Sequence, residues 1–137
     1  MKYRLIDHTS DLGIHVFGSD LKDLFINAAD AMFDQITIVK DLLPEKELKI
    51  HVSGSDWPDL MVNWLRELLY LWTGKELLVK QIDIKILSEY NLTATLKIDS
   101  FRPDKHIIKN DIKAVTYHQI RVDQVTDGWE SKIIFDL

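Results

Sequence analysis

The 137-residue chain contains no cysteine, five glycines and three prolines. The absence of cysteine excludes disulfide frameworks, thiolate zinc sites and thiol nucleophiles, and it is compatible with a reducing compartment. No Gly/Pro/Ser linker and no low-complexity segment divide the chain, and we expect no internal repeat. Since a domain takes roughly 150 residues, residues 1–137 are expected to form one domain.

Long apolar runs and an excess of positive charge are also missing. No segment approaches the roughly 18 apolar residues that cross a bilayer, and a carboxylate at Asp7 interrupts the N-terminus where a signal peptide would be apolar. Lysine and arginine total 17 against 22 acidic residues, a net charge of −5. Because nucleic-acid affinity comes mainly from neutralising phosphates, stand-alone RNA or DNA binding is not expected. These features predict a cytoplasmic protein without membrane contact.

General catalytic motifs are absent too. The sequence has no phosphate-binding G-x-x-x-x-G-K-[ST] or G-x-G-x-x-G loop, no H-E-x-x-H zinc motif and no G-x-S-x-G elbow. An NTP-binding enzyme with a glycine-rich loop is therefore disfavoured.

Apolar residues at helical spacing predict two helices. The first covers residues 21–36, with Ser19 or Asp20 as its cap. The second begins at residues 55–58 and stops near Gly74. Its three tryptophans share one stripe and are expected in the core.

Alternating apolar and polar residues predict the strands, at residues 3–6, 13–17, 48–52, 82–86, 92–98, 112–125 and 129–137. Hairpin turns are expected at Asn91 and at Asp127-Gly128. Grouped helices followed by grouped strands predict an α+β fold, with two helices packed on a mainly antiparallel or mixed sheet.

A dense polar turn, residues 7–11, lies between the first two strands. Asp7 and Asp11 are four residues apart and would offer oxygen ligands to Ca²⁺, Mg²⁺ or Mn²⁺. The alternative is an Asx-type turn, in which these side chains bond their own backbone.

The end of the chain carries a second pair of carboxylates. Asp136 adjoins the carboxylate of Leu137, so two like charges share one place unless a cation or donors compensate them. If the last strand pairs beside the first, these groups meet Asp7 or Asp11 and form a hard-cation site. The alternative is a frayed, solvated terminus.

The third cluster contains Lys113 and His118 and follows His106. Strand alternation would place Lys113 and Tyr117 on one face and His118 on the other. His118 is a candidate base or ligand, against the alternative of a half-buried structural histidine. The five histidines show no close paired spacing, which disfavours zinc.

Four segments in order resemble the archease family. They are D-H-T-S-D-L-G-I from Asp7, D-L-M-V-N-W-L-R-E-L-L-Y from Asp59, I-K-A-V-T-Y-H from residue 112, and the final I-F-D-L. The match spans essentially the whole chain. Departures are mild: Ser10 replaces a usual alanine, and Leu137 a usual isoleucine.

The resemblance implies an archease-like fold and a non-catalytic activator of the RtcB-type tRNA-splicing RNA ligase. That ligase joins a 2′,3′-cyclic phosphate or 3′-phosphate end to a 5′-hydroxyl after guanylation of its Mn²⁺-bound histidine. The activator promotes guanylation and multiple turnover, meeting tRNA only through the ligase. The resemblance also implies a divalent cation at Asp11, Asp136 and the Leu137 carboxylate, with Ca²⁺ as the first choice and Mg²⁺ or Mn²⁺ as alternatives. Further functional candidates without assigned roles are Asp7, Asp59, His106, Lys113 and His118.

Two other functions stay open from the sequence. One is a general chaperone-like modulator of RNA-processing proteins, which would need exposed apolar surface. The other is a small metal-dependent hydrolase using Asp7, Asp11 and His118. The sequence has no nucleophile motif that supports this function. The loop at residues 102–109, with Lys105 and His106, is a candidate contact surface for the ligase.

Overall fold

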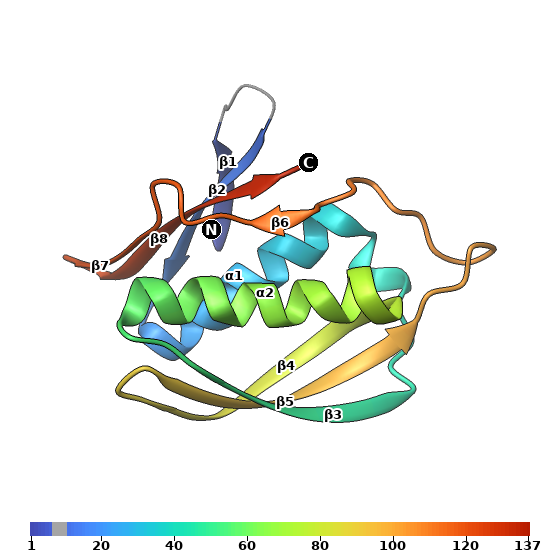
Figure 1. Cartoon of the computed structure of the whole chain (residues 1–137), viewed down its shortest axis with the longest axis horizontal. Helices are drawn as coiled ribbons and strands as arrows, with labels where there is room; N and C mark the ends of the chain where they lie inside the picture. Colours follow the sequence, from blue (N-terminus) through green and yellow to red (C-terminus); the bar gives the residue numbers. More distant parts are fainter. Residues whose placement is uncertain (7–10) are drawn as a thin grey trace.

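The computed structural model describes residues 1–6 and 11–137, with two helices between two antiparallel sheets (Figure 1). Helix α1 (Leu21–Ile36) and helix α2 (Trp57–Lys75) each contact strands of both sheets. The predicted α+β class and both predicted helix starts are confirmed. No helix in the described part of the chain is long and apolar enough to cross a membrane.

The strands form two separate sheets. The first has the order β1-β2-β8-β6, with β7 also paired to β8, and the second has the order β3-β5-β4. The strand bounds are β1 Tyr3–Ile6, β2 Asp11–Gly18, β3 Lys46–Ser53, β4 Leu77–Ser88, β5 Asn91–Ser100, β6 Ala114–Val115, β7 Arg121–Val125 and β8 Gly128–Asp136. A short 3-10 turn, η1, covers Val39–Asp41. The prediction of a single sheet is wrong. Helices that are apolar on most of their surface need a sheet on either side to cover them.

The expectation of no internal repeat is wrong. Residues 14–27 and 50–63 share the pattern I-H-V-x-G-S-D-x-x-D-L-x-x-N. Each copy runs from the end of a strand into a helix, β2 into α1 and β3 into α2. The repeat is hard to recognise from the sequence because it crosses the boundary between a strand and a helix. Its variable positions also include Trp57 and Pro58, which differ strongly from their counterparts in the first copy.

The two copies begin their helices with the same bonds. In the first copy, the Asp23 backbone N–H donates to the Asp20 carboxylate (2.8 Å), and Ser19 donates its backbone N–H to Asp23 (2.9 Å). This reciprocal arrangement is a capping box, which satisfies amides that the helix leaves unpaired. Bonds of the same lengths join Ser55, Asp56 and Asp59 in the second copy.

Glycine is required where each strand meets its helix. A Cβ atom on Gly18 would lie 2.4 Å from the backbone nitrogen of Leu24, and one on Gly54 would lie 2.5 Å from that of Leu60. The obstacle is backbone, which cannot move aside without shifting the helix. The repeated glycine therefore fixes the angle at which each helix leaves its strand.

The core lies where the helices meet the sheets. Trp64 is fully buried, and its indole N–H donates to the Phe25 carbonyl oxygen at 2.9 Å, joining α2 to α1. Trp57 and Trp72 are partly buried and pack against the core. The prediction that the three tryptophans serve packing is confirmed.

Several predicted boundaries are wrong, among them that of β4, which covers Leu77–Ser88 and not residues 82–86. Residues 112–125 do not form one strand: β6 ends at Val115, a turn containing Gln119 (φ 55°) follows, and β7 begins at Arg121. The predicted alternation of faces through this segment fails with it. Helix α2 runs past Gly74, and Glu76 ends it in the left-handed conformation (φ 55°).

Candidate functional site

The candidate site is the corner where β2 begins and β8 ends. These strands pair antiparallel, and the register places Asp11 directly opposite Asp136. Directly opposed residues of such a pair project from the same face with Cβ atoms about 5 Å apart. We expected this meeting if the last strand paired beside the first; the last strand instead pairs with β2, and this pairing brings Asp136 opposite Asp11.

Strand alternation turns both carboxylates away from the core. Ile14 of β2 and Phe135 of β8 belong to the buried core, and Asp11 and Asp136 lie an odd number of residues from them, on the opposite face of their strands. Asp11 is half-buried, while Asp136 and Leu137 are exposed. The end of β8 is held in the sheet, which argues against the alternative of a frayed terminus.

The β6 segment secures this corner from the other side. Ala114 pairs with Asp136, and the Lys113 backbone N–H donates to the Asp136 carbonyl oxygen at 2.9 Å. Thr116 adds a hydroxyl bond of 2.9 Å to the Ile134 carbonyl. The Lys113 side chain is exposed. The third and fourth motif segments thus form one hydrogen-bonded unit.

The side chains at this corner are paired carboxylates. Like charges directly opposite each other destabilise a sheet, and carboxylate oxygens are the ligands that Ca²⁺, Mg²⁺ and Mn²⁺ prefer. Across residues 1–6 and 11–137, no three histidine, aspartate or glutamate side chains cluster to hold a metal ion. A cation here would accordingly need a third oxygen source besides Asp11 and Asp136. Asp7 lies outside the described residues.

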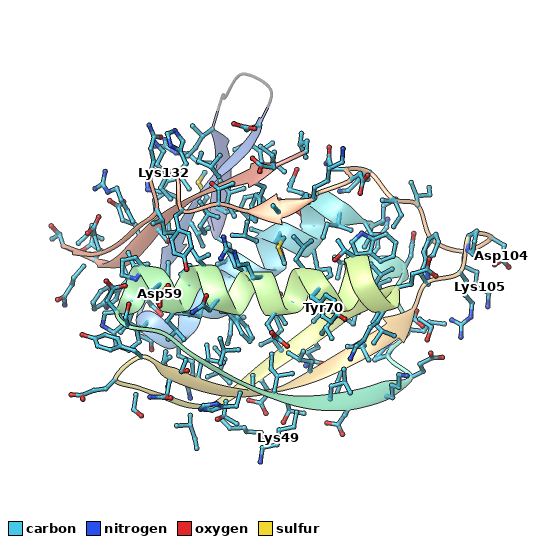
Figure 2. All side chains as sticks on the ribbon, viewed as in Figure 1. Lys49, Asp59, Tyr70, Asp104, Lys105 and Lys132 are labelled. Carbon is cyan, nitrogen blue, oxygen red and sulfur yellow. The ribbon has the colours of Figure 1, made fainter. Side chains whose placement is uncertain are left out.

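Asp59 belongs to the capping box of α2, at the left end of that helix in Figure 2. One carboxylate oxygen accepts the Ser55 N–H, and the other accepts the Tyr117 hydroxyl at 2.7 Å. The Tyr117 hydrogen bond is the main reason that the pKa of Asp59 lies below its usual value, and Asp59 in turn raises the pKa of Tyr117. Asp59 therefore joins the second motif segment to the third.

Arg66 is a residue that the sequence reasoning missed. Its Nε–H donates to the Val115 carbonyl oxygen at 3.1 Å, and its guanidinium carbon lies 4.7 Å from the centre of the Tyr117 ring. Both partners lie in the third motif segment, and Arg66 lies in the second. Its place seven residues after Asp59, two turns along the same helix face, was the available signal.

His106 occupies a closed structural position. Its ring is buried, with Nε2 3.2 Å from the Asp99 carboxylate and Nδ1 accepting the Arg102 backbone N–H at 3.0 Å. Arg102 completes the cluster by donating to Asp99 at 3.1 Å. Both ring nitrogens are therefore engaged in holding the loop between β5 and β6. The neighbouring Lys105 projects from this loop at the right of Figure 2, on a different part of the molecule from the corner.

His118 lies in the turn between β6 and β7 and is exposed. Its backbone N–H donates to the Thr116 hydroxyl at 3.2 Å. The structure brings Asp11 opposite Asp136, with Leu137 next in the chain and the Lys113 backbone bonded to Asp136. Asp59 is bonded to Tyr117 instead, and His106 contacts Asp99.

Comparison with known proteins gives one consistent family. Residues 3–137 match the Archease protein family (MTH1598/TM1083). The chain is 32% identical to the protein archease of Archaeoglobus fulgidus over the full length of both, and 31% identical to that of Methanosarcina acetivorans, covering 99% of this chain and 96% of the relative.

Two solved structures are similar. Protein 1598 of Methanobacterium thermoautotrophicum has a TM-score of 0.83 and 26% identity, with 99% of each chain covered. A Thermotoga maritima protein described as an archease and possible chaperone has a TM-score of 0.68 and 20% identity, covering 98% of this chain and 96% of that one. The whole-length family match and the relatives above 30% identity place this chain in the archease family.

Proposed function

We propose that this chain is a non-catalytic activator of an RtcB-type RNA ligase in tRNA splicing and RNA repair. It would promote guanylation of the ligase histidine and sustained turnover. The observation that carries the proposal is the pairing of Asp11 with Asp136 at the end of the β2–β8 ladder. Membership of the archease family supports it.

Asp11, Asp136 and the carboxylate of Leu137 would hold a divalent cation, Ca²⁺ first and Mg²⁺ or Mn²⁺ as alternatives. The donor set fits, since all three groups are hard oxygen ligands and the first two share one face of the sheet. A bound cation supplies neutralisation of negative charge, the general means by which phosphoryl and nucleotidyl transfer is assisted.

The chain's own part is to present this corner rigidly. The β2–β8 ladder holds Asp11 and Asp136 in register, and the Lys113 N–H fixes the Asp136 backbone from β6. Two exposed residues end the strand, so the acidic corner can enter a partner's active site without unfolding the sheet. RNA would be met through the ligase, since a chain of net charge −5 has little attraction for phosphates.

A chaperone-like role is the second candidate, because the similar Thermotoga maritima protein is described as a possible chaperone. Such a role calls for a contiguous apolar surface. The large exposed apolar side chains come from several elements, among them Leu5 on β1, Ile86 on β4 and Tyr70 on α2. This distribution over both sheets and a helix is the reason that we rank the activator first. Suppression of aggregation of an unrelated protein would favour the chaperone.

The test is RNA joining by the source organism's RtcB-type ligase, with RNA ends in large excess over ligase. We expect added wild-type protein to convert a stalled single turnover into sustained turnover, with faster labelling of the ligase histidine. Asp136→Ala should abolish the effect while the far-ultraviolet circular dichroism stays unchanged. Glu47→Ala is the matched control, since Glu47 is an exposed carboxylate on β3. No stimulation by wild type with GTP, Mn²⁺ and an active ligase would refute the proposal.

A further inference from the structure

A small cavity lies between the outer face of α2 and β6. Its volume is about 200 Å³, and Arg66, Tyr70 and Thr73 of α2 line it together with Leu69 and residues 113–115. Tyr70 projects from the exposed face of α2 (Figure 2). The cavity is below the roughly 300–1,000 Å³ typical of small-molecule sites, so it suits a single chemical group rather than a whole metabolite.

The charge of this α2–β6 cavity is unlike that of its surroundings. Arg66 and Lys113 contribute two positive charges, and no carboxylate is among its described lining residues. By contrast, the larger cavity of about 460 Å³ between α1 and β4 has lysines facing Asp30 and Asp34. In a chain of net charge −5, a cavity of purely positive charge selects an anionic group.

Arg66 is held ready to bind such a group. Its Nε–H is bonded to the Val115 carbonyl, and its guanidinium lies over the Tyr117 ring, so the side chain is fixed before any partner arrives. Within the described residues, its two terminal nitrogens make no hydrogen bond. The carboxylate of Asp59 acts on Arg66 electrostatically, but its oxygens already accept bonds from Tyr117 and Ser55. A guanidinium with terminal N–H groups to spare is suited to bidentate bonding of a carboxylate.

Two exposed tyrosines accompany Arg66. Tyr70 lines the cavity and is 54% exposed, and Tyr117, whose ring lies under the Arg66 guanidinium, is 48% exposed. Tyrosine and arginine are enriched in protein–protein interfaces and among the residues that contribute most to binding. A fixed arginine accompanied by two exposed tyrosines therefore fits a protein partner that presents an acidic side chain.

We propose that the α2–β6 cavity is a docking site for an aspartate or glutamate side chain of the partner protein, with Arg66 and Lys113 binding the carboxylate beside Tyr70. The identification of that partner as the ligase rests on the proposed function above. The cavity lies beside β6, whose other edge pairs with β8, so a partner docked here would also reach the Asp11–Asp136 corner.

Charge reversal tests the docking site. Binding of the ligase to immobilised protein would be measured for wild type, Arg66→Glu, Lys113→Glu and Lys49→Glu. Lys49→Glu is the matched control, because it makes the same change in net charge from an exposed position on β3 (Figure 2). We expect the first two variants to weaken binding about tenfold or more and the control to change it less than about twofold. Equal binding by all four proteins would overturn the proposal.

A second measurement separates this proposal from the proposed function. If the wild type fails to bind or stimulate the ligase, the activator function fails, and the cavity is then tested with inorganic phosphate as the anionic probe. Nuclear magnetic resonance should show saturable shifts at the Arg66, Tyr70 and Lys113 amides that Lys113→Glu abolishes. Shifts spread over all surface lysines would overturn the anion site.

RNA is the competing occupant, because exposed tyrosines can stack on bases. Fluorescence anisotropy with a single-stranded oligonucleotide distinguishes it. We expect no saturable RNA binding at moderate salt. RNA binding that Tyr70→Ala and Lys113→Glu both weaken, with ligase binding unchanged, would assign the cavity to RNA and overturn the proposal.

Discussion

Corresponding positions in the two copies of the repeat carry opposite charge arrangements. Counting back equally from the shared I-H-V pattern, Asp11 of β2 corresponds to Glu47 of β3. Glu47 pairs with Lys97 of β5, whereas Asp11 pairs with Asp136 of β8. Opposite charges that face each other across a sheet stabilise it, and like charges that face each other weaken it. The two strand pairs therefore differ in the charge that lies opposite the acidic side chain.

The helix caps show the same division. Asp23 and Asp59 make the same bonds to their own serine, but Asp59 also accepts the Tyr117 hydroxyl. Helix α1 is largely buried, while α2 keeps an exposed face that includes Arg66 and Tyr70. The helix of the first copy therefore serves mainly the core, whereas the helix of the second copy also presents an exposed face.

Substitution of Gly18 and Gly54 tests whether the two copies share the same strand–helix junction. Gly18→Ala and Gly54→Ala should each lower the free energy of unfolding by about 3 kcal/mol, because each new Cβ meets helix backbone. Urea unfolding measures both. A loss below 1 kcal/mol in either variant would show that the strand–helix junctions of the two copies are not equivalent.

Substitution of Asn27 and Asn63 should lower stability by different amounts in the two copies. Asn27 donates to the Phe17 carbonyl at 2.8 Å and is buried, whereas Asn63 donates to the Ser53 carbonyl at 2.9 Å from a more exposed place. We expect Asn27→Ala to cost about 1–3 kcal/mol, because a buried carbonyl loses its donor, and Asn63→Ala to cost about 1 kcal/mol. Equal costs in urea unfolding would contradict the difference in burial.

Substitutions that exchange the charges opposite Glu47 and Asp11 test whether these pairs affect stability differently. Lys97→Glu places like charges opposite each other in the second copy and should lower stability by about 0.2–1 kcal/mol. Asp136→Asn removes the like-charge pair of the first copy and should raise stability by a similar amount in chelator. Thermal unfolding in EDTA compares them, and a destabilised Asp136→Asn variant would argue against repulsion at the corner.

The smallest effect concerns acid stability. The pKa of Asp59 is lowered in the folded protein, chiefly by the Tyr117 hydrogen bond. Its contribution is therefore present above the unfolded-state pKa of about 3.9 and is lost as pH falls through the folded value. Tyr117→Phe should move the pKa of Asp59 upward and flatten the fall in stability below pH 4. The Asp59 carboxyl resonance followed against pH measures this, and an unchanged pKa of Asp59 would refute the link.

Much of this fold could be predicted because its signals are local. The apolar stripe of residues 21–36, the cap before Trp57 and the alternation around Asn91 each determine one element without long-range information. The meeting of Asp136 with Asp7 or Asp11 was expected only on the condition that the last strand pairs beside the first, and the resemblance to the archease family selected Asp11.

The rest depends on contacts that sequence spacing does not contain. The division into two sheets arises because both helices need cover on two sides, and the break after Val115 arises because the chain must turn at Gln119 before pairing again with β8. The Arg66–Val115 bond spans 49 residues and involves a backbone carbonyl, which no side-chain pattern reveals. The repeat was visible in the sequence, and a comparison of the two helix starts would have found it.

The most direct test of the cation site is calcium-dependent thermal unfolding of wild type and Asp136→Asn, each in EDTA and across a Ca²⁺ titration. A ligand that binds only the folded state adds about 2.7 kcal/mol at a hundred times its Kd. We predict that Ca²⁺ raises the unfolding midpoint of the wild type and leaves that of Asp136→Asn unchanged, while a C-terminal extension after Leu137 weakens the response. An equal rise in wild type and Asp136→Asn, or no rise in wild type with Ca²⁺, Mg²⁺ or Mn²⁺, would contradict a cation held at the β2–β8 corner.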